Sequence, residues 1–87
     1  MTEYSVEVRV TPRRGILDPQ GSAVRGALRS LGFGEVGEVH VGRLIVFGVE
    51  ADSESAAAER AEAMCRQLLA NPVTEDFDVR VTAPAAA

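Results

Sequence analysis

The sequence contains no lysine, and this absence removes several kinds of chemistry. All nine basic residues among the 87 are arginine. Without lysine, a Schiff base, a P-loop and a lysine general base are all excluded. A single cysteine excludes an internal disulfide and a cysteine-rich zinc site, and a single histidine is weak evidence for metal binding. Composition therefore leaves little room for an active site within this chain.

Positive charge, aromatic residues and long apolar runs are also scarce. The formal net charge is −4, and only four residues are aromatic. Nucleic-acid binding needs clustered positive charge, and RNA recognition also favours exposed aromatics, so neither is expected. The longest apolar run, residues 44–49, is too short to cross a bilayer, and MTEYSVEVRV lacks the pattern of a secretory signal. We expect a cytoplasmic protein without nucleic-acid or membrane partners.

The pattern of apolar residues predicts four strands. Three of them have the spacing of a strand with one buried face, over residues 4–11, 36–41 and 77–81, and the remaining one is a short apolar run over residues 44–49. Gly42 and Arg43 form a plausible turn between the middle two segments. The 44–49 segment is apolar on both faces, whereas helices cover only one face of an antiparallel sheet of this kind. We therefore expect another chain to cover the open face.

Two further segments have the helical spacing of apolar residues. Asp18 is the expected N-cap of the first helix, Pro19 its first residue and Gly32 its end. The second helix is expected to begin after a cap at residues 52–53 and to end at residues 71–72. The side chains expected to face inward are Val24, Ala27, Leu28 and Leu31 in the first helix, and Ala57, Ala61, Met64, Cys65 and Leu68 in the second.

The resulting order is β-α-β-β-α-β, which predicts an α+β fold of the ferredoxin-like type. We expect a four-stranded antiparallel sheet with both helices on one face, and the other face used for oligomerisation. One domain is expected over residues 1–82, with a disordered tail over residues 83–87. Because this fold serves many functions, it does not by itself indicate one.

Few side chains suggest chemistry. Cys65 lies on the apolar stripe of the second helix, which favours a buried, inert thiol over a nucleophile. His40 has no companion ligand, so a satisfied polar role is favoured over a metal or acid–base site. Glu75, Asp76 and Asp78 would suit a cation, but a solvated strand face explains them better. No catalytic constellation is expected.

The stretch GILDPQG, residues 15–21, joins the first strand to the first helix. It contains no nucleotide-binding pattern, and Asp18 and Pro19 are explained by helix capping. Arg13 and Arg14 precede it and suit an anion, a protein interface or a solvated turn. The sequence therefore predicts a helix start with an exposed contact surface.

Several motifs together resemble the PurS family, the small subunit of phosphoribosylformylglycinamidine synthase in purine biosynthesis. The resemblance spans residues 4–81, and its most specific segments are LDPQG and LLANPV. The matching motifs are GILDPQG at 15–21, SLGF at 30–33, VGR at 41–43, MC at 64–65 and LLANPV at 68–73.

The resemblance implies a subunit of an ATP-dependent glutamine amidoligase with no active site of its own. Such chains form dimers or tetramers, bridge the synthetase and glutaminase subunits and support ammonia transfer, while ATP and Mg²⁺ are used by the complex and not bound by this chain. A ligand-sensing regulatory module of the ACT type is the alternative. The residues expected at the partner interface are Arg13, Arg14, Gly15, Leu17, Asp18, Pro19, Gln20, Gly21, Asn71, Pro72 and Val73.

Overall fold

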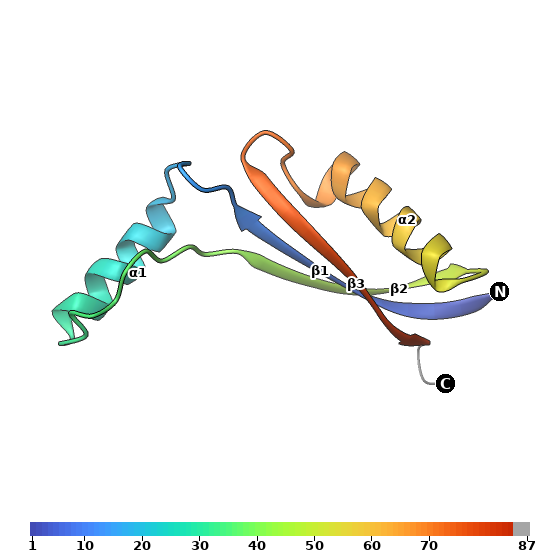
Figure 1. Cartoon of the computed structure of the whole chain (residues 1–87), viewed down its shortest axis with the longest axis horizontal. Helices are drawn as coiled ribbons and strands as arrows, with labels where there is room; N and C mark the ends of the chain where they lie inside the picture. The colour runs from blue at the N-terminus through green and yellow to red at the C-terminus, as the bar shows by residue number, and fades with distance from the viewer. Residues whose placement is uncertain (85–87) are drawn as a thin grey trace.

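The structure, a computed structural model, describes residues 1–84. Three strands and two helices follow one another along this part of the chain (Figure 1). The fold is α+β with an antiparallel sheet, as the periodicity predicts. In order, the elements are β1 (Thr2–Pro12), α1 (Pro19–Ser30), β2 (Arg43–Ala51), α2 (Glu54–Met64), the π-helical turn η1 (Cys65–Leu69) and β3 (Glu75–Pro84).

The core lies between the sheet and helix α2. The strands are ordered β2-β1-β3, and β1 is antiparallel to both neighbours. Val6, Val8 and Val10 alternate onto one face of β1 and are fully buried together with Ala61 and Cys65. Each buried valine contributes about 1.5–3 kcal/mol relative to an exposed one. The central strand and α2 therefore supply most of the hydrophobic stabilisation.

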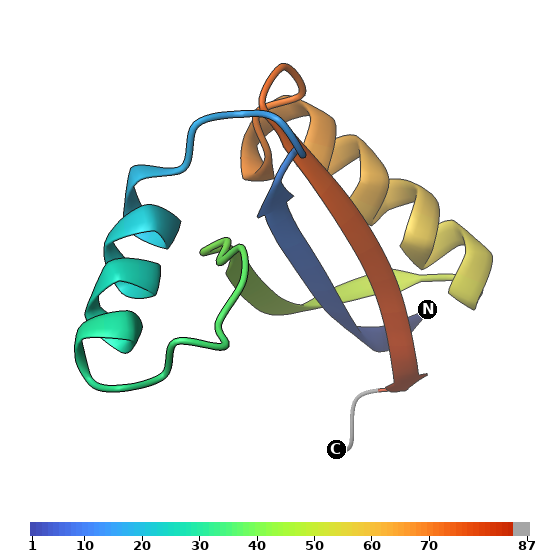
Figure 2. The same cartoon turned by 60° about the vertical axis from the view of Figure 1, so that its left-hand side comes forward.

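The prediction of a four-stranded sheet with both helices on one face is wrong on two points. Within residues 1–84 the sheet has three strands, because residues 36–42 form no strand. Helix α2 packs on the sheet, whereas α1 stands beyond the end of the sheet (Figures 1 and 2). The apolar stripe of α1 is consequently uncovered, and Leu31 is 74% exposed.

Residues 13–42 form one projecting unit that we call the arm. It consists of the loop after β1, helix α1 and the segment that returns to β2 (Figure 2). Gly32, with a φ of +105°, ends α1 as predicted, and the Phe33 N–H donates to the Leu28 carbonyl at 3.0 Å. The chain then runs back along the helix, and the Arg29 side chain donates a hydrogen bond to the Val36 carbonyl of this returning segment. Residues 36–41 therefore pack on α1 and do not join the sheet.

The projecting arm makes the molecule elongated. Its radius of gyration is 16.5 Å and its extents are 51 × 29 × 15 Å. A compact domain of this length has a radius of gyration of about 12 Å. The difference shows that the arm extends away from the core and is not folded over it.

The second helix ends in a wide turn that its periodicity does not reveal. Ser53 caps α2, in agreement with one of the two predicted caps. From Cys65 onward the helix widens into η1, and each π-helical turn takes up more residues than an α-helical one. Leu68, which is predicted to be buried, is exposed for this reason, and Leu69 packs against the core in its place.

The sheet face opposite α2 is largely charged, with Leu44 and Val46 exposed at its β2 side. That another chain covers this face remains a prediction. At the other edge, β3 continues to Pro84, which is paired with Tyr4. The ordered strand therefore extends two residues past the expected domain end at residue 82, and the rest of the expected tail, residues 85–87, lies outside the described residues.

Gly21 and Gly26 provide a matched test of how the arm packs. A Cβ at Gly21 would collide with the Val39 carbonyl oxygen, whereas a Cβ at Gly26 would meet nothing within 4 Å. We expect Gly21→Ala to lower the free energy of unfolding by about 1–3 kcal/mol through overpacking. Gly26→Ala should raise it by up to about 1 kcal/mol through helix propensity. Urea unfolding of both variants measures this, and equal effects would contradict the described packing.

Candidate functional site

Asp18 joins the start of α1 to the chain that returns to the sheet. Its Oδ1 accepts the Gly21 N–H at 3.0 Å, which is the predicted N-cap bond. Its Oδ2 accepts the Val41 N–H at 2.9 Å, from the far end of the arm. One carboxylate thus joins the two ends of the arm at its base. Of its two hydrogen bonds, only the N-cap bond to Gly21 can be predicted from local sequence.

The same hydrogen bonds lower the pKa of the Asp18 carboxyl group. The Gly21 N–H has the largest effect, the Val41 N–H comes next, and the nearby His40 ring adds a smaller one. Nδ1 of His40 lies 3.6 Å from Oδ2 of Asp18, and Nε2 lies 3.6 Å from Oε2 of Glu38. Backbone donors stabilise the charged form of a carboxylate, so Asp18 remains ionised at neutral pH.

The LLANPV segment forms a hydrogen-bonded turn between η1 and β3. The Asn71 side chain accepts the Val73 N–H at 3.0 Å, and the Asn71 carbonyl accepts the Glu75 N–H at 2.8 Å. Arg43, at the start of β2, donates to both oxygens of Glu75 at 2.8 and 3.1 Å and to the Leu69 carbonyl at 2.7 Å. The hydrogen bond with Arg43 lowers the pKa of Glu75, and that with the Asn71 N–H adds to the effect. A bidentate ion pair therefore fixes this turn to the sheet.

The two segments predicted to face partner subunits meet at one end of the sheet. The Arg13 N–H donates to the Thr74 carbonyl at 2.9 Å, and Nε of Arg13 lies 3.1 Å from Oδ1 of Asp76. The GILDPQG loop and the LLANPV turn are therefore adjacent, although the first ends at residue 21 and the second begins at residue 68. We call residues 13–21 together with residues 68–75 the docking end.

A cleft of about 490 Å³ opens at the docking end. It is lined by residues 16–20 of the loop and helix start, residues 41–43, and Thr74 and Glu75. Large apolar side chains protrude beside it, with Leu17 82% exposed and Val73 74% exposed. Exposed apolar side chains on a hydrogen-bonded frame are typical of a surface that contacts another protein.

The predicted interface residues occupy different parts of this surface. Residues 17–20 line the cleft, and Gly21 packs under it against the returning chain. Arg13 is engaged within the chain by Asp76, so its side chain has a structural role that the sequence does not show. Arg14 and Gly15 form an exposed turn, in which Gly15 takes a φ of +82°. Asn71, Pro72 and Val73 form the exposed tip of the second segment.

Of the remaining candidates, Cys65 lies in the core, and the acidic residues lie at the docking end or on the strand that leaves it. Cys65 is fully buried, as predicted, and burial raises the pKa of its thiol. Asp76 pairs with Arg13, while Asp78 stays exposed on the open sheet face. Within residues 1–84, no three His, Cys, Asp or Glu side chains are placed to hold a metal ion, and no helix has the length and apolar character needed to span a membrane.

Sequence reasoning missed Arg43, Glu75 and Leu68 as parts of this surface. Arg43 and Glu75 are 32 residues apart, so no local pattern indicates that they pair. Leu68 has a core position in an unbroken α-helix, so its spacing predicts a buried side chain. The motifs at residues 41–43 and 68–73 were the available signals, and each contains or adjoins one of the missed residues.

The comparisons with known proteins agree along nearly the whole chain. A family model described as PurS, phosphoribosylformylglycinamidine (FGAM) synthase, matches residues 5–83. The PurS subunit of FGAM synthase from Synechocystis is 40% identical over 80 residues, which cover 92% of this chain and 80% of the relative. The structure of Bacillus subtilis PurS is similar with a TM-score of 0.81 and 39% identity, covering 92% of this chain and 99% of that one. A chain of the PurLQS structure from Thermotoga maritima has a TM-score of 0.85 and 30% identity, covering 94% and 100%.

The fold is that of a small α+β protein, and the docking end gives it exposed apolar side chains on a hydrogen-bonded frame. The chain belongs to the PurS family, and PurS is a subunit of FGAM synthase in purine biosynthesis. The resemblance carried by LDPQG and LLANPV is therefore confirmed. The ACT-type alternative finds no support in these matches.

Replacing Asp18 with asparagine tests its role at the base of the arm. The folded state lowers the pKa of this carboxyl group, so its contribution is present above about pH 4 and is lost as the pH falls through the folded-state value. We expect Asp18→Asn to be less stable than wild type at pH 7 and to lose less stability between pH 5 and pH 3. Urea unfolding at pH 7, 5 and 3 measures both effects.

The control for this substitution is Asp78→Asn, which removes an exposed carboxylate from the open sheet face. It should leave the pH profile close to that of wild type. A profile for Asp18→Asn that is as steep as that of wild type would show that the two backbone hydrogen bonds do not hold the charged form.

Proposed function

We propose that this chain is the non-catalytic bridge of the FGAM synthase complex. It holds the glutaminase subunit and the ATP-dependent synthetase subunit in one orientation in the cytoplasm. ATP and Mg²⁺ belong to the synthetase in this proposal, and the bridge binds neither. The observation that carries the proposal is the docking end, where Arg13 and Arg43 fix two distant motifs into one exposed surface.

The chemistry of the reaction gives such a bridge a clear task. Ammonia released from glutamine becomes protonated in water and loses its nucleophilicity, so it must pass between active sites along a closed path. A bridge that holds both subunits replaces a bimolecular encounter by a fixed geometry. The similarity to a chain of the PurLQS structure from Thermotoga maritima, at a TM-score of 0.85, supports a role inside a multi-subunit assembly.

Reconstitution of the synthetase and glutaminase subunits with and without this chain tests the bridging role. We expect amidine formation from glutamine to require the chain, because ammonia must be delivered between subunits. Formation from added ammonium chloride should proceed without it. Equal rates with and without the chain from both nitrogen sources would contradict the proposal.

Substitutions at the docking end test whether this surface contacts the partner subunits. Leu17→Asp combined with Val73→Asp places two charges on its exposed apolar side chains, and should reduce glutamine-dependent turnover at least tenfold while sparing ammonia-dependent turnover. Ser55→Asp, on the exposed first turn of α2, is the control and should behave as wild type. Cys65→Ser should also leave turnover nearly unchanged, provided that the variant folds.

We further propose that the chain self-associates as a dimer, or as a tetramer built from dimers, through the arm. Its accessible surface is 6061 Å², whereas a monomeric protein of 9.2 kDa exposes about 4,900 Å². The excess of about 1,100 Å² is comparable to the ≈ 800 Å² that each partner buries in an interface of standard size.

Two uncovered surfaces of the chain are both apolar and could therefore pack on each other. Helix α1 exposes Val24 and Leu31, and the α2 side of the sheet leaves Ile45, Phe47 and Val49 only partly buried. A helix laid beside α2 would cover this part of the sheet, but the chain's own α1 is held away from it (Figure 1). In this proposal, α1 of a second copy supplies the cover.

Light scattering coupled to size-exclusion chromatography tests this arrangement. We expect Val24→Gln with Leu31→Gln to convert the oligomer to monomers, because both side chains face solvent in a single chain and would be buried only against a second copy. Ala23→Gln with Ser30→Gln, outside the stripe, should keep the wild-type mass. If the stripe variant stays oligomeric and Leu44→Gln with Val46→Gln becomes monomeric, the contact lies on the open sheet face.

A further inference from the structure

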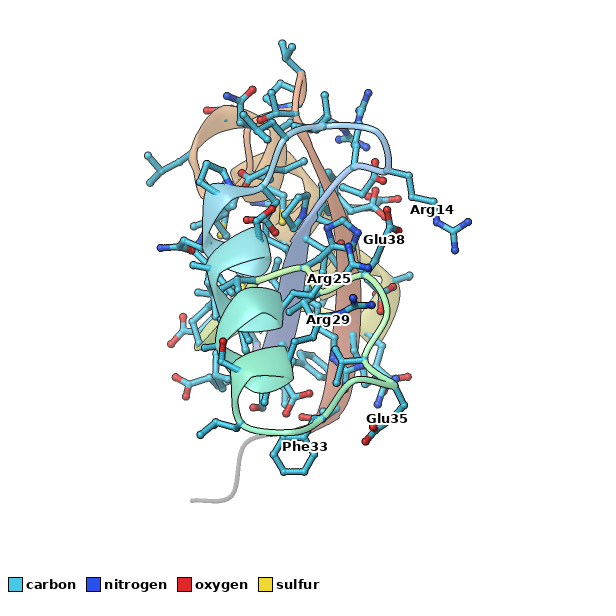
Figure 3. All side chains as sticks on the ribbon, turned by 90° about the vertical axis from the view of Figure 1, so that its left-hand side faces the viewer. Arg14, Arg25, Arg29, Phe33, Glu35 and Glu38 are labelled. Carbon is cyan, nitrogen blue, oxygen red and sulfur yellow. The ribbon has the colours of Figure 1, made fainter. Side chains whose placement is uncertain are left out.

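The arm presents a second surface, formed by arginine side chains. Figure 3 shows Arg25 and Arg29 on successive turns of α1, lying between that helix and the segment that returns through Glu35 and Glu38. Arg14 projects on the same side from the loop before α1. We call Arg14, Arg25 and Arg29 the arginine surface.

These arginines make no ion pair among residues 1–84, as is also true of Arg9, Arg60 and Arg80, whereas three other arginines do. Arg13, Arg43 and Arg66 each lie within 4.0 Å of a carboxylate oxygen, at 3.1, 2.8 and 3.3 Å. In the part of the chain that the structure describes, no carboxylate lies that close to any member of the arginine surface. Acidic residues outnumber basic ones by thirteen to nine. Positive charge is therefore left unpaired here although the chain as a whole has an excess of carboxylates.

The arm orders one of the two helical arginines and shields part of the other from solvent. Arg29 donates to the Val36 carbonyl at 3.2 Å, which fixes its side chain along the returning segment. Arg25 is half-buried, and its Nε is shielded from solvent with no hydrogen-bond partner among residues 1–84. It borders a pocket of about 170 Å³ that Asp18, Glu38 and His40 also line. Side chains that are already ordered lose less conformational entropy on binding.

We propose that the arginine surface binds an acidic segment of one of the two partner subunits, a proposal that rests on the bridging function. Guanidinium groups form bidentate hydrogen bonds with carboxylates, and among residues 1–84 no carboxylate lies within 4.0 Å of Arg14, Arg25 or Arg29. Phe33, 48% exposed at the lower tip of the arm in Figure 3, offers an apolar anchor of the kind found at the centre of protein interfaces.

This surface and the self-association stripe occupy different sides of α1. Arg25 and Arg29 each follow a residue of the apolar stripe by one position, and one position turns an α-helix by about 100°. A second copy can therefore cover Val24 and Leu31 while the arginines stay accessible to a different partner. The arm would then contact a copy of itself on one side and a partner subunit on another.

Binding to each purified partner subunit, measured by biolayer interferometry at 50 and 300 mM NaCl, tests the proposal. We expect Arg25→Gln with Arg29→Gln to weaken binding to one subunit by about tenfold at low salt and to make binding less salt-dependent, because two charge pairs are lost. Arg60→Gln with Arg80→Gln removes the same charge from α2 and β3, and should bind as wild type does.

Unchanged affinity and salt dependence of the Arg25→Gln, Arg29→Gln variant would overturn the proposal. The charge-keeping Arg25→Lys, Arg29→Lys variant distinguishes charge from distortion of the arm: it should retain more affinity than the glutamine variant, and an equal loss in both would also overturn the proposal. Wild-type chain that binds neither subunit would instead contradict the bridging function itself. Failure of the inference and failure of the bridging function are thus distinguished by the wild-type measurement.

Discussion

The shape of this protein depends on one carboxylate. Asp18 accepts hydrogen bonds from the first turn of α1 and from Val41, the residue from which the chain returns to the sheet. Gly21 permits the close approach of helix and returning chain that these bonds require. Because both ends of the arm are tied to the same side chain, α1 projects beyond the sheet as part of a closed loop and does not fold back over it.

The position of the arm explains why so small a chain exposes so much apolar surface. The core consists of three β1 valines beneath α2, and α1 adds little to it. A domain of this size gains limited stability from its own core, so contacts with other chains are a natural source of more. The small core of the single chain and its exposed apolar surface thus both follow from the position of the arm.

The docking end differs from helix α1, because its polar groups form hydrogen bonds and ion pairs within the chain. Arg43 bonds Glu75 and the Leu69 carbonyl, Arg13 bonds Thr74 and Asp76, and Asn71 orders the turn between them. These bonds leave apolar side chains as the exposed tips. Binding through such a surface requires little reordering, which suits a part that must hold two large subunits in a fixed relation. The arginine surface differs in that its charges are unpaired within residues 1–84, which favours a partner that supplies the carboxylates.

Local sequence was sufficient wherever the deciding interactions are between near neighbours. The alternation in β1, the cap at Asp18, the stop at Gly32 and the burial of Cys65 were all predictable, because periodicity and capping act over a few residues. The family could also be identified from the sequence, because LDPQG and LLANPV occur together. Tertiary structure decided the rest. Residues 36–41 have a strand pattern but pack on α1, and Leu68 has a helical core position but is turned outward by the π-helical turn. The bonds that produce these outcomes, Asp18 to Val41 and Arg43 to Glu75, join residues 23 and 32 positions apart. No periodic pattern encodes a contact at that separation, and it forms only when the chain has folded.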